Sequence, residues 1–275
     1  MLHLLIALVA CGQLWCVLEV IGIPLPAPHI VLGIEGVILV AAMLAALRRH
    51  GEPSELARWS FVGIAVWVIW GTAYFGAARI TDPPNARTFD DVLLHRLPLL
   101  PSFTAVYLGV HVFSMIPYCA LPELRQLRRY LLGNMLIVML SAILWITLPV
   151  RLDRPPFEMT STFGSWLLQG VYRWDPTTNC FPSAHCAIAV YSAIWMRFTP
   201  RPLFIWGIFS AAAICVSTVL TKQHYVADVA GGAVLAALAA YAMRRRPVRM
   251  PDSVRTLEPP RGAELEHRDD DSKSA

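Results

Sequence analysis

Long uninterrupted apolar blocks dominate the chain and restrict it to folds that can lie in a lipid bilayer. A helix that crosses a bilayer needs ~20 mostly apolar residues. Blocks that reach or approach this length lie at 2–22, 30–47, 59–78, 102–121, 131–149, 184–199, 203–220 and 224–243. The strands of a membrane barrel would instead be short and alternating. We therefore predict an all-α, polytopic membrane helix bundle with about eight transmembrane helices.

Composition and charge agree with this class. Hydrophobic residues make up 56% of the chain and charged residues 15%, whereas soluble domains are ~25% charged. The net charge of +4 is accounted for by basic residues that flank the apolar blocks, and the sequence has no Gly-rich phosphate loop, CxxC pair or nucleic-acid motif. We expect the lipid bilayer as a partner, and no nucleic acid.

The blocks divide the chain into three predicted parts. Residues 1–48 hold two additional N-terminal transmembrane helices, and the first is expected to be retained because it lacks the basic start of a signal peptide. Residues 59–245 form a six-helix membrane core. Residues 246–275 are polar, contain proline and lack aromatic side chains, which is typical of a disordered tail.

Basic residues predict the orientation. The flanks on the side of both termini carry more arginine than the opposite flanks, and basic loops stay in the cytoplasm. The termini are therefore expected to be cytoplasmic. The loops at 80–101, 150–183 and 221–223 would face outward, which is periplasmic if the membrane is a bacterial inner membrane.

Polar residues gather at the start of the last apolar block, in the segment STVLTKQHYVADVAGG. His224 and Asp228 are four residues apart, so they share one helix face. A carboxylate that accepts a hydrogen bond from one imidazole nitrogen fixes the tautomer and leaves the other nitrogen as a nucleophile. Lys222 lies just before. The alternative is a lysine that reaches the membrane interface beside a structural His–Asp pair.

A second polar cluster, Pro182-Ser183-Ala184-His185, precedes the sixth block. Ser183 is a natural N-cap, and the N–H groups and positive dipole end of a helix start form a ready anion site. His185 adds a proton donor in the first turn. Capping alone is the alternative.

Two arginines follow the fifth block. Arg151 and Arg154 lie in the same outer loop as Ser183, and guanidinium groups recognise phosphate through paired, charge-assisted hydrogen bonds. A solvated loop in which Asp153 neutralises one arginine is the alternative. Together with the two histidines and Asp228, these cations compose a phosphoryl-transfer site without a metal-ligand cluster.

The remaining candidate groups receive structural interpretations. Cys180 and Cys186 lie near the outer surface, and whether they form a disulfide stays open because the bond needs a specific geometry. His111 lies in the middle of the fourth block. We expect it to be hydrogen-bonded inside the bundle and assign it no catalytic role.

These segments resemble the three motifs of the type-2 phosphatidic acid phosphatase superfamily, also called lipid phosphate phosphatases and related to vanadium haloperoxidases. The motifs are K-x6-R-P, P-S-G-H and S-R-x5-H-x3-D. The matching residues are Arg154-Pro155, Pro182-Ser183-Ala184-His185, and Ser217, His224 and Asp228, with Gly232 at a glycine position often found after the aspartate.

The resemblance implies a role for each matching residue. His224 would be the nucleophile that forms a phosphohistidine, with Asp228 orienting it, and His185 would protonate the leaving oxygen. Arg154, Ser183 and the helix-start amide of Ala184 would hold the phosphate. The reaction needs neither a metal nor another cofactor.

Two residues of this chain differ from the family motifs. Thr147 occupies the lysine position of the first motif, and Thr218 the arginine position of the third. We hypothesise that Arg151 and Lys222, each four residues further along, supply the missing positive charges. The altered motifs and the segment 90-DDVLLHRLPLLPSFTAVYL-108 are similar to the inositol phosphorylceramide and sphingomyelin synthase branch, which transfers a phospho-headgroup between lipids.

The sequence therefore predicts an integral-membrane phosphatase or phosphotransferase whose substrate is a membrane lipid phosphate or phospholipid. The two activities share their first step, so the candidate residues do not separate them. The alternative from another class is a non-enzymatic, lipid-binding member of the same fold, which the two missing bases favour.

Overall fold

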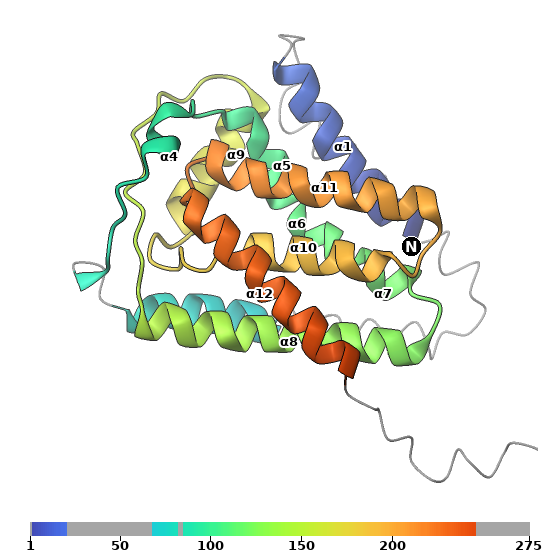
Figure 1. The fold of residues 1–275 in the computed structure, drawn as a ribbon. Helices are drawn as coiled ribbons and strands as arrows, with labels where there is room; N and C mark the ends of the chain where they lie inside the picture. The colour runs from blue at the N-terminus through green and yellow to red at the C-terminus, as the bar shows by residue number, and fades with distance from the viewer. Residues whose placement is uncertain (1, 21–67, 82–84, 246–275) are drawn as a thin grey trace, which may run out of the picture. The chain divides into compact units, whose positions relative to one another are not determined.

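The computed structural model describes residues 2–20, 68–81 and 85–245, and its described part is a bundle of α-helices (Figure 1). The long helices are α1 (Leu2–Val20), α8 (Leu124–Thr147), α11 (Arg201–Leu220) and α12 (Val226–Arg245), with the shorter α9 (Phe163–Trp174) and α10 (Ala184–Met196). Residues 68–80 are also helical. The described residues contain no strand, only isolated bridges that join Val150 to Arg87 and to Asn179. The predicted all-α class is confirmed.

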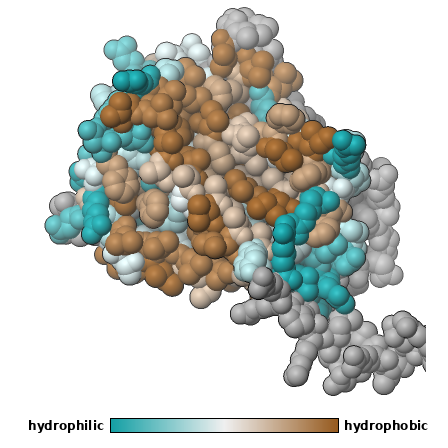
Figure 2. Space-filling model, viewed as in Figure 1, coloured by the Kyte–Doolittle hydropathy of each residue, from teal (hydrophilic) through white to brown (hydrophobic). Residues whose placement is uncertain are grey.

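Three described helices are long and apolar enough to cross a membrane: Arg125–Thr147, Arg201–Leu220 and Val226–Arg244. The helix Ala184–Met196 is apolar but shorter. Exposed large apolar side chains lie along these helices, at Leu132, Met139, Ile143, Phe209, Val216, Val234 and Leu238 among others. Figure 2 shows that apolar side chains, coloured brown, spread across the middle of one face, with hydrophilic side chains gathered toward its left and right edges. The protein is therefore an integral membrane protein.

Helix α10 forms the centre of the bundle. It packs against α8, α11 and α12 (Figure 1), and small residues allow the close approach that membrane helices favour. Ala187 of α10 and Ala236 of α12 are fully buried in one apolar cluster with Tyr130 and Tyr191. The tight α10–α12 contact brings the N-terminal ends of these two helices together.

The predicted block at 102–121 is not one regular helix. The chain forms a 3-10 turn η2 (Pro101–Phe103) and the short helices α5 (Thr104–Leu108), α6 (Val110–Phe113) and α7 (Ile116–Ala120). Helical hydrogen bonds continue across Gly109, whose N–H donates to Ala105 O at 3.0 Å. Pro117 lacks an N–H and cannot bond back to Phe113 O, which explains the break before α7.

The predicted outer loop 150–183 contains a helix that the sequence analysis missed. Helix α9 is amphipathic, and Thr162 caps it by accepting a hydrogen bond from Ser165 N at 3.3 Å. Its twelve residues are too few to cross a bilayer, so a search for long apolar blocks passes over it.

Other helix boundaries differ from the predicted blocks by two to seven residues. Helix α8 begins at Leu124, seven residues before the predicted block at 131–149, and α12 begins at Val226 rather than at 224. The predicted block at 30–47, the first part of 59–78 and the tail at 246–275 lie outside the described residues. The division into parts at 1–48, 59–245 and 246–275 remains a prediction.

Candidate active site

The turn between α11 and α12 carries His224. It begins with a Schellman motif: Gln223 N donates to Thr218 O at 2.9 Å and Lys222 N donates to Val219 O at 3.1 Å. Lys222 occupies the left-handed position of this motif with φ 54°, where glycine is usual. The motif ends α11 sharply and turns His224 back over the bundle.

His224 is held by its Nδ1 atom. Nδ1 lies 3.0 Å from Cys180 O and 3.4 Å from Asp228 Oδ2, and both side chains are buried. Asp228 Oδ2 also accepts a hydrogen bond from Tyr225 N at 2.8 Å at the start of α12. With Nδ1 engaged in this way, Nε2 is the imidazole nitrogen left for chemistry.

Burial and charge act in opposite directions on His224. Burial alone would lower the pKa of the imidazole, but the hydrogen bond that it donates to Asp228, the negative charge of that carboxylate and smaller contributions from Cys186 and Asp175 together outweigh it. The result is a pKa above the ordinary histidine value. The neighbouring Cys180 thiol has its pKa raised by burial, so it stays protonated, and it donates to Thr177 O at 3.2 Å.

Ser183 caps α10, as the sequence predicts. Its side chain accepts a hydrogen bond from Cys186 N at 3.3 Å, and its own N–H donates to Asp228 O at 3.1 Å. The last bond ties the start of α10 directly to α12. Trp145 of α8 supports the preceding residue, because its indole donates to Pro182 O at 3.2 Å.

The two histidines predicted from separate motifs lie together. The ring centroids of His185 and His224 are 6.0 Å apart, and both residues are buried. Gly232 allows the close approach of α10 and α12 that brings these residues together, since a Cβ there would lie 2.5 Å from Ser183 O and 3.1 Å from Ala187 N. The glycine position noted in the sequence is therefore a point of close backbone packing.

Arg154 is buried at the edge of the site and held by a loop. Its guanidinium donates to Asp175 O at 2.9 Å and to Pro176 O at 3.4 Å, and lies 3.6 Å from Asp175 Oδ2. The Asp175 carboxylate accepts further hydrogen bonds from the hydroxyls of Tyr74 and Tyr107. Sequence reasoning assigned no role to Asp175 or to either tyrosine, because these contacts join segments far apart in the chain.

Lys222 and Arg151, the other two cations predicted to bind phosphate, form contacts outside the pair of histidines. Lys222 Nζ donates to Leu94 O and Leu97 O, both at 2.6 Å, at the end of the short helix α4 (Val92–Arg96). Burial lowers the pKa of this amine, and the charge of Asp91 opposes that shift.

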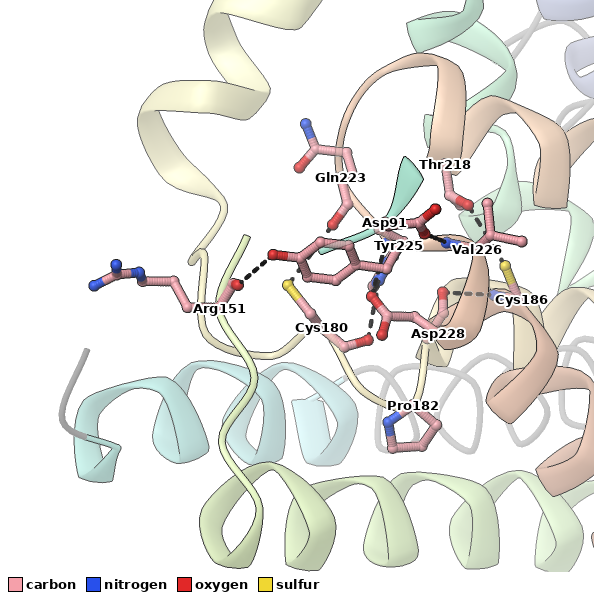
Figure 3. Close-up of polar contacts among 12 residues, drawn as sticks. Asp91, Arg151, Cys180, Pro182, Cys186, Thr218, Gln223, Tyr225, Val226 and Asp228 are labelled. Carbon is pink, nitrogen blue, oxygen red and sulfur yellow. Dashed lines mark hydrogen bonds and ion pairs between the residues drawn. The ribbon is translucent and has the colours of Figure 1, made fainter. Parts of the chain in front are cut away.

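Arg151 also has a partner of its own. Its guanidinium is bound to Asp153, with Nε 3.0 Å from Oδ1, and Figure 3 shows it pointing away from Asp228.

Asp91 explains why α4 lies beside this turn. Its carboxylate accepts from Leu94 N at 2.9 Å and from Val226 N at 2.8 Å, so one side chain caps α4 and the start of α12 (Figure 3). On the other side, Tyr225 Oη donates to Arg151 O at 3.0 Å. Residues 91–97, the first part of the segment 90–108 noted in the sequence, thus fix the turn that carries His224.

A cavity of about 680 Å³ opens on one side of His185. Its walls are largely aromatic and include Trp70, Tyr107, His111, Trp166, Asp175 and His185. His111, assigned to the bundle interior from the sequence, lines this cavity with its ring centroid 5.7 Å from that of His185. The cavity is large enough for part of an organic substrate.

Three residues around His224 have atoms that could bind a metal ion. Ligand-type atoms of Cys180, His224 and Asp228 lie within 4.8 Å of one another, so these three residues could hold a borderline-soft ion such as zinc. The question of a disulfide between Cys180 and Cys186, left open by the sequence, is answered by the structure, in which both thiols are free.

Fold and site together define a helical membrane protein with two buried histidines and a carboxylate at adjoining helix starts. Residues 126–249 match the family model of the PAP2 superfamily. The match confirms the resemblance inferred from the motifs: this part of the chain, which contains all three motifs, is similar to the PAP2 superfamily, whose members are generally phosphatases and phosphotransferases. No curated protein and no solved structure matches the chain.

Proposed function

We propose that the protein is a membrane phosphatase or phosphotransferase that cleaves a lipid phosphate ester through a phosphohistidine on His224. The observation that carries this proposal is the pairing of two buried histidines 6.0 Å apart, of which only His224 is bound through Nδ1 to a carboxylate. One imidazole is thereby oriented as a nucleophile, and the other lies where a leaving group would depart.

The first step forms a bond from His224 Nε2 to phosphorus and breaks the bond from phosphorus to the lipid oxygen. His185 gives its proton to that oxygen, so the lipid leaves as a neutral alcohol. Asp228 stabilises the positive charge that develops on the His224 ring. In the second step an acceptor hydroxyl attacks phosphorus, His185 takes its proton, and His224 is regenerated. In this mechanism, side chains of the protein supply every group that the two reaction steps use.

The helix start of α10 would bind the phosphate oxygens. Ser183 Oγ engages the N–H of Cys186, whereas the N–H groups of Ala184 and His185 have no intrahelical acceptor by their position. Such groups, at the positive end of the helix dipole, favour an anion. Arg154 supplies a fixed positive charge at the edge of the site. A role of Lys222 and Arg151 as replacements for the missing motif bases remains a prediction.

The cavity favours an organic phosphate over inorganic phosphate. Its aromatic walls adjoin His185, the residue that would protonate the leaving group, and apolar surface there would bind the lipid part. The same space could admit an alcohol acceptor beside water, which makes a headgroup transferase of the sphingolipid-synthase type the second candidate. Following the distribution of basic residues, we place this end of the bundle on the outer face of the membrane and the termini in the cytoplasm.

The direct test is a comparison of wild-type protein with His224→Ala in lipid nanodiscs. Both would be incubated with ³²P-labelled phosphatidic acid, lysophosphatidic acid and a prenyl phosphate, with and without an added acceptor, either inositol or a diacylglycerol whose acyl chains differ from those of the labelled lipid. Release of phosphate by wild type alone supports a phosphatase, and transfer of label to the acceptor alone supports the transferase. Equal turnover by both proteins, or none by either with any substrate, would contradict an enzymatic role and favour a lipid-binding protein.

A further inference from the structure

We propose that Asp175 is a positioning residue that fixes the proton donor His185 through the ring of Tyr107. The inference rests on the proposed function of His185 and deepens it. It identifies a second route, separate from the His224–Asp228 pair, by which a carboxylate controls one of the two histidines.

The ring of Tyr107 is stacked on the ring of His185. The centroids are 4.3 Å apart and the planes differ by 22°. Trp70 and His111 form T-shaped pairs with the same imidazole, with centroids 6.3 Å and 5.7 Å away. Of these three rings, only that of Tyr107 lies nearly parallel to the imidazole, and it is also the nearest, so it limits the rotation that would move the His185 nitrogens.

Asp175 fixes Tyr107 from its other end. The Tyr107 hydroxyl donates to Asp175 Oδ2 at 2.8 Å, and the tyrosine is almost fully buried. Arg154 in turn holds Asp175 by a contact to the carboxylate and a 2.9 Å hydrogen bond to its backbone oxygen. The chain of contacts therefore runs from Arg154 to Asp175, to Tyr107, and to His185.

Tyr74 provides a matched control within the same network. Its hydroxyl also donates to Asp175, but its ring stacks on Trp70, with centroids 5.0 Å apart, and meets Trp145 edge-on. Loss of either tyrosine hydroxyl removes one hydrogen bond to the same carboxylate. Only in the case of Tyr107 does the freed ring lie flat on His185.

The chemistry of the leaving group separates positioning from general support of the fold. An alkyl phosphate leaves as a strongly basic alkoxide and depends on a well-placed proton donor, whereas a nitrophenolate departs without a proton. A displaced His185 should therefore slow cleavage of phosphatidic acid more than cleavage of nitrophenyl phosphate. A loss of overall folding would slow both by the same factor.

The experiment measures kcat/KM for both substrates and takes their ratio, in nanodiscs, for wild type and for variants of Asp175, Tyr107, Tyr74 and His185. We expect Asp175→Asn and Tyr107→Leu to lower the ratio by roughly tenfold or more, since small misplacements of a catalytic group have large effects. Tyr107→Phe, which keeps the ring but loses the tether, should lower it less. Tyr74→Phe should leave it within about twofold.

The His185→Ala variant separates a failure of the proposed proton donor from a failure of the proposed positioning role of Asp175. If His185→Ala slows both substrates equally, the proposed proton donor is wrong and the proposed function fails at that step. If His185→Ala lowers the ratio but Asp175→Asn and Tyr107→Leu do not, the positioning role is overturned while the proposed function stands. Asp175→Glu keeps the charge and should restore part of the ratio, which separates a positioning defect from misfolding of the asparagine variant.

Discussion

The two sides of the candidate site are built in different ways. The helix-start face, made of Ser183, His185, His224 and Asp228, is assembled largely by backbone contacts at the adjoining ends of α10 and α12. The cavity face, made of Tyr74, Tyr107, Arg154 and Asp175, is assembled by side-chain contacts between segments up to 101 residues apart. The helix-start face depends on the packing of α10 against α12, whereas the cavity face depends on the ion pair of Arg154 with Asp175.

This difference predicts different responses to substitution. On the helix-start face, a changed side chain should alter chemistry while the backbone contacts persist. On the cavity face, removal of one charge leaves another buried charge without its partner, so stability should change together with activity.

The largest effect is expected for Asp228→Asn on the helix-start face. The carboxylate raises the pKa of His224 by hydrogen bonding and by charge, and the nucleophile must be unprotonated. The substitution should therefore move the acidic limb of the kcat/KM profile to lower pH, because His224 loses its proton more easily. The maximum rate should still fall by about 10³-fold, since the asparagine no longer stabilises the charged ring. A rate profile between pH 4 and 9 measures both changes, and an acidic limb that moves upward would contradict the assignment.

Arg154→Met should produce the largest loss of stability on the cavity face. The side chains of Arg154 and Asp175 are 8% and 17% exposed, so the substitution leaves a mostly buried carboxylate without its cation. Removing one partner of a buried pair costs about 3–5 kcal/mol. The double variant Arg154→Met/Asp175→Asn should recover part of this loss, and thermal unfolding in the same detergent compares the two. Equal unfolding temperatures for wild type and Arg154→Met would show that the pair carries no stability.

Gly232→Ala tests the backbone contact of the helix-start face. The added Cβ would meet Ser183 O at 2.5 Å, and backbone yields less readily than a side chain. We expect a loss of about 1–3 kcal/mol in the free energy of unfolding and reduced activity, because α10 must move away from α12. Gly76→Ala is the matched control in the helical residues 68–80, where nothing lies within 4 Å of the new atom. If both variants behave like wild type, the close approach of the two helices is not required.

The contrast between the faces also explains what could be predicted from the sequence. Ser183 as a cap and the contact of His224 with Asp228 were predicted from local spacing, and the structure has both contacts. His224 lies in the turn before α12, however, and not on the helix face that the spacing predicted. Asp175 was visible only as a polar residue in a loop. Its partners Tyr74 and Tyr107 lie in other helices, and no local pattern connects them.

The positions of the cations could not be derived from spacing for a related reason. Lys222 is four residues beyond Thr218, but α11 has already ended and the chain has turned through a left-handed residue. Helical periodicity therefore no longer relates the two side chains, and Lys222 reaches the carbonyl oxygens at the end of α4 instead. A rule for regular helices fails where the sequence places a motif across a helix end.

The smallest effect is expected for Arg151→Ala, which tests where the cavity face ends. The guanidinium is paired with Asp153, whose side chain is 72% exposed, and an exposed pair contributes only about 0–1 kcal/mol. We expect kcat/KM for phosphatidic acid to change by less than about twofold, against a much larger loss for Arg154→Met. The hypothesis that Arg151 replaces the missing lysine at Thr147 requires a higher KM with an unchanged unfolding temperature. A tenfold rise in KM would place Arg151 in the phosphate site when substrate is bound, and would mean that its pairing with Asp153 breaks on binding.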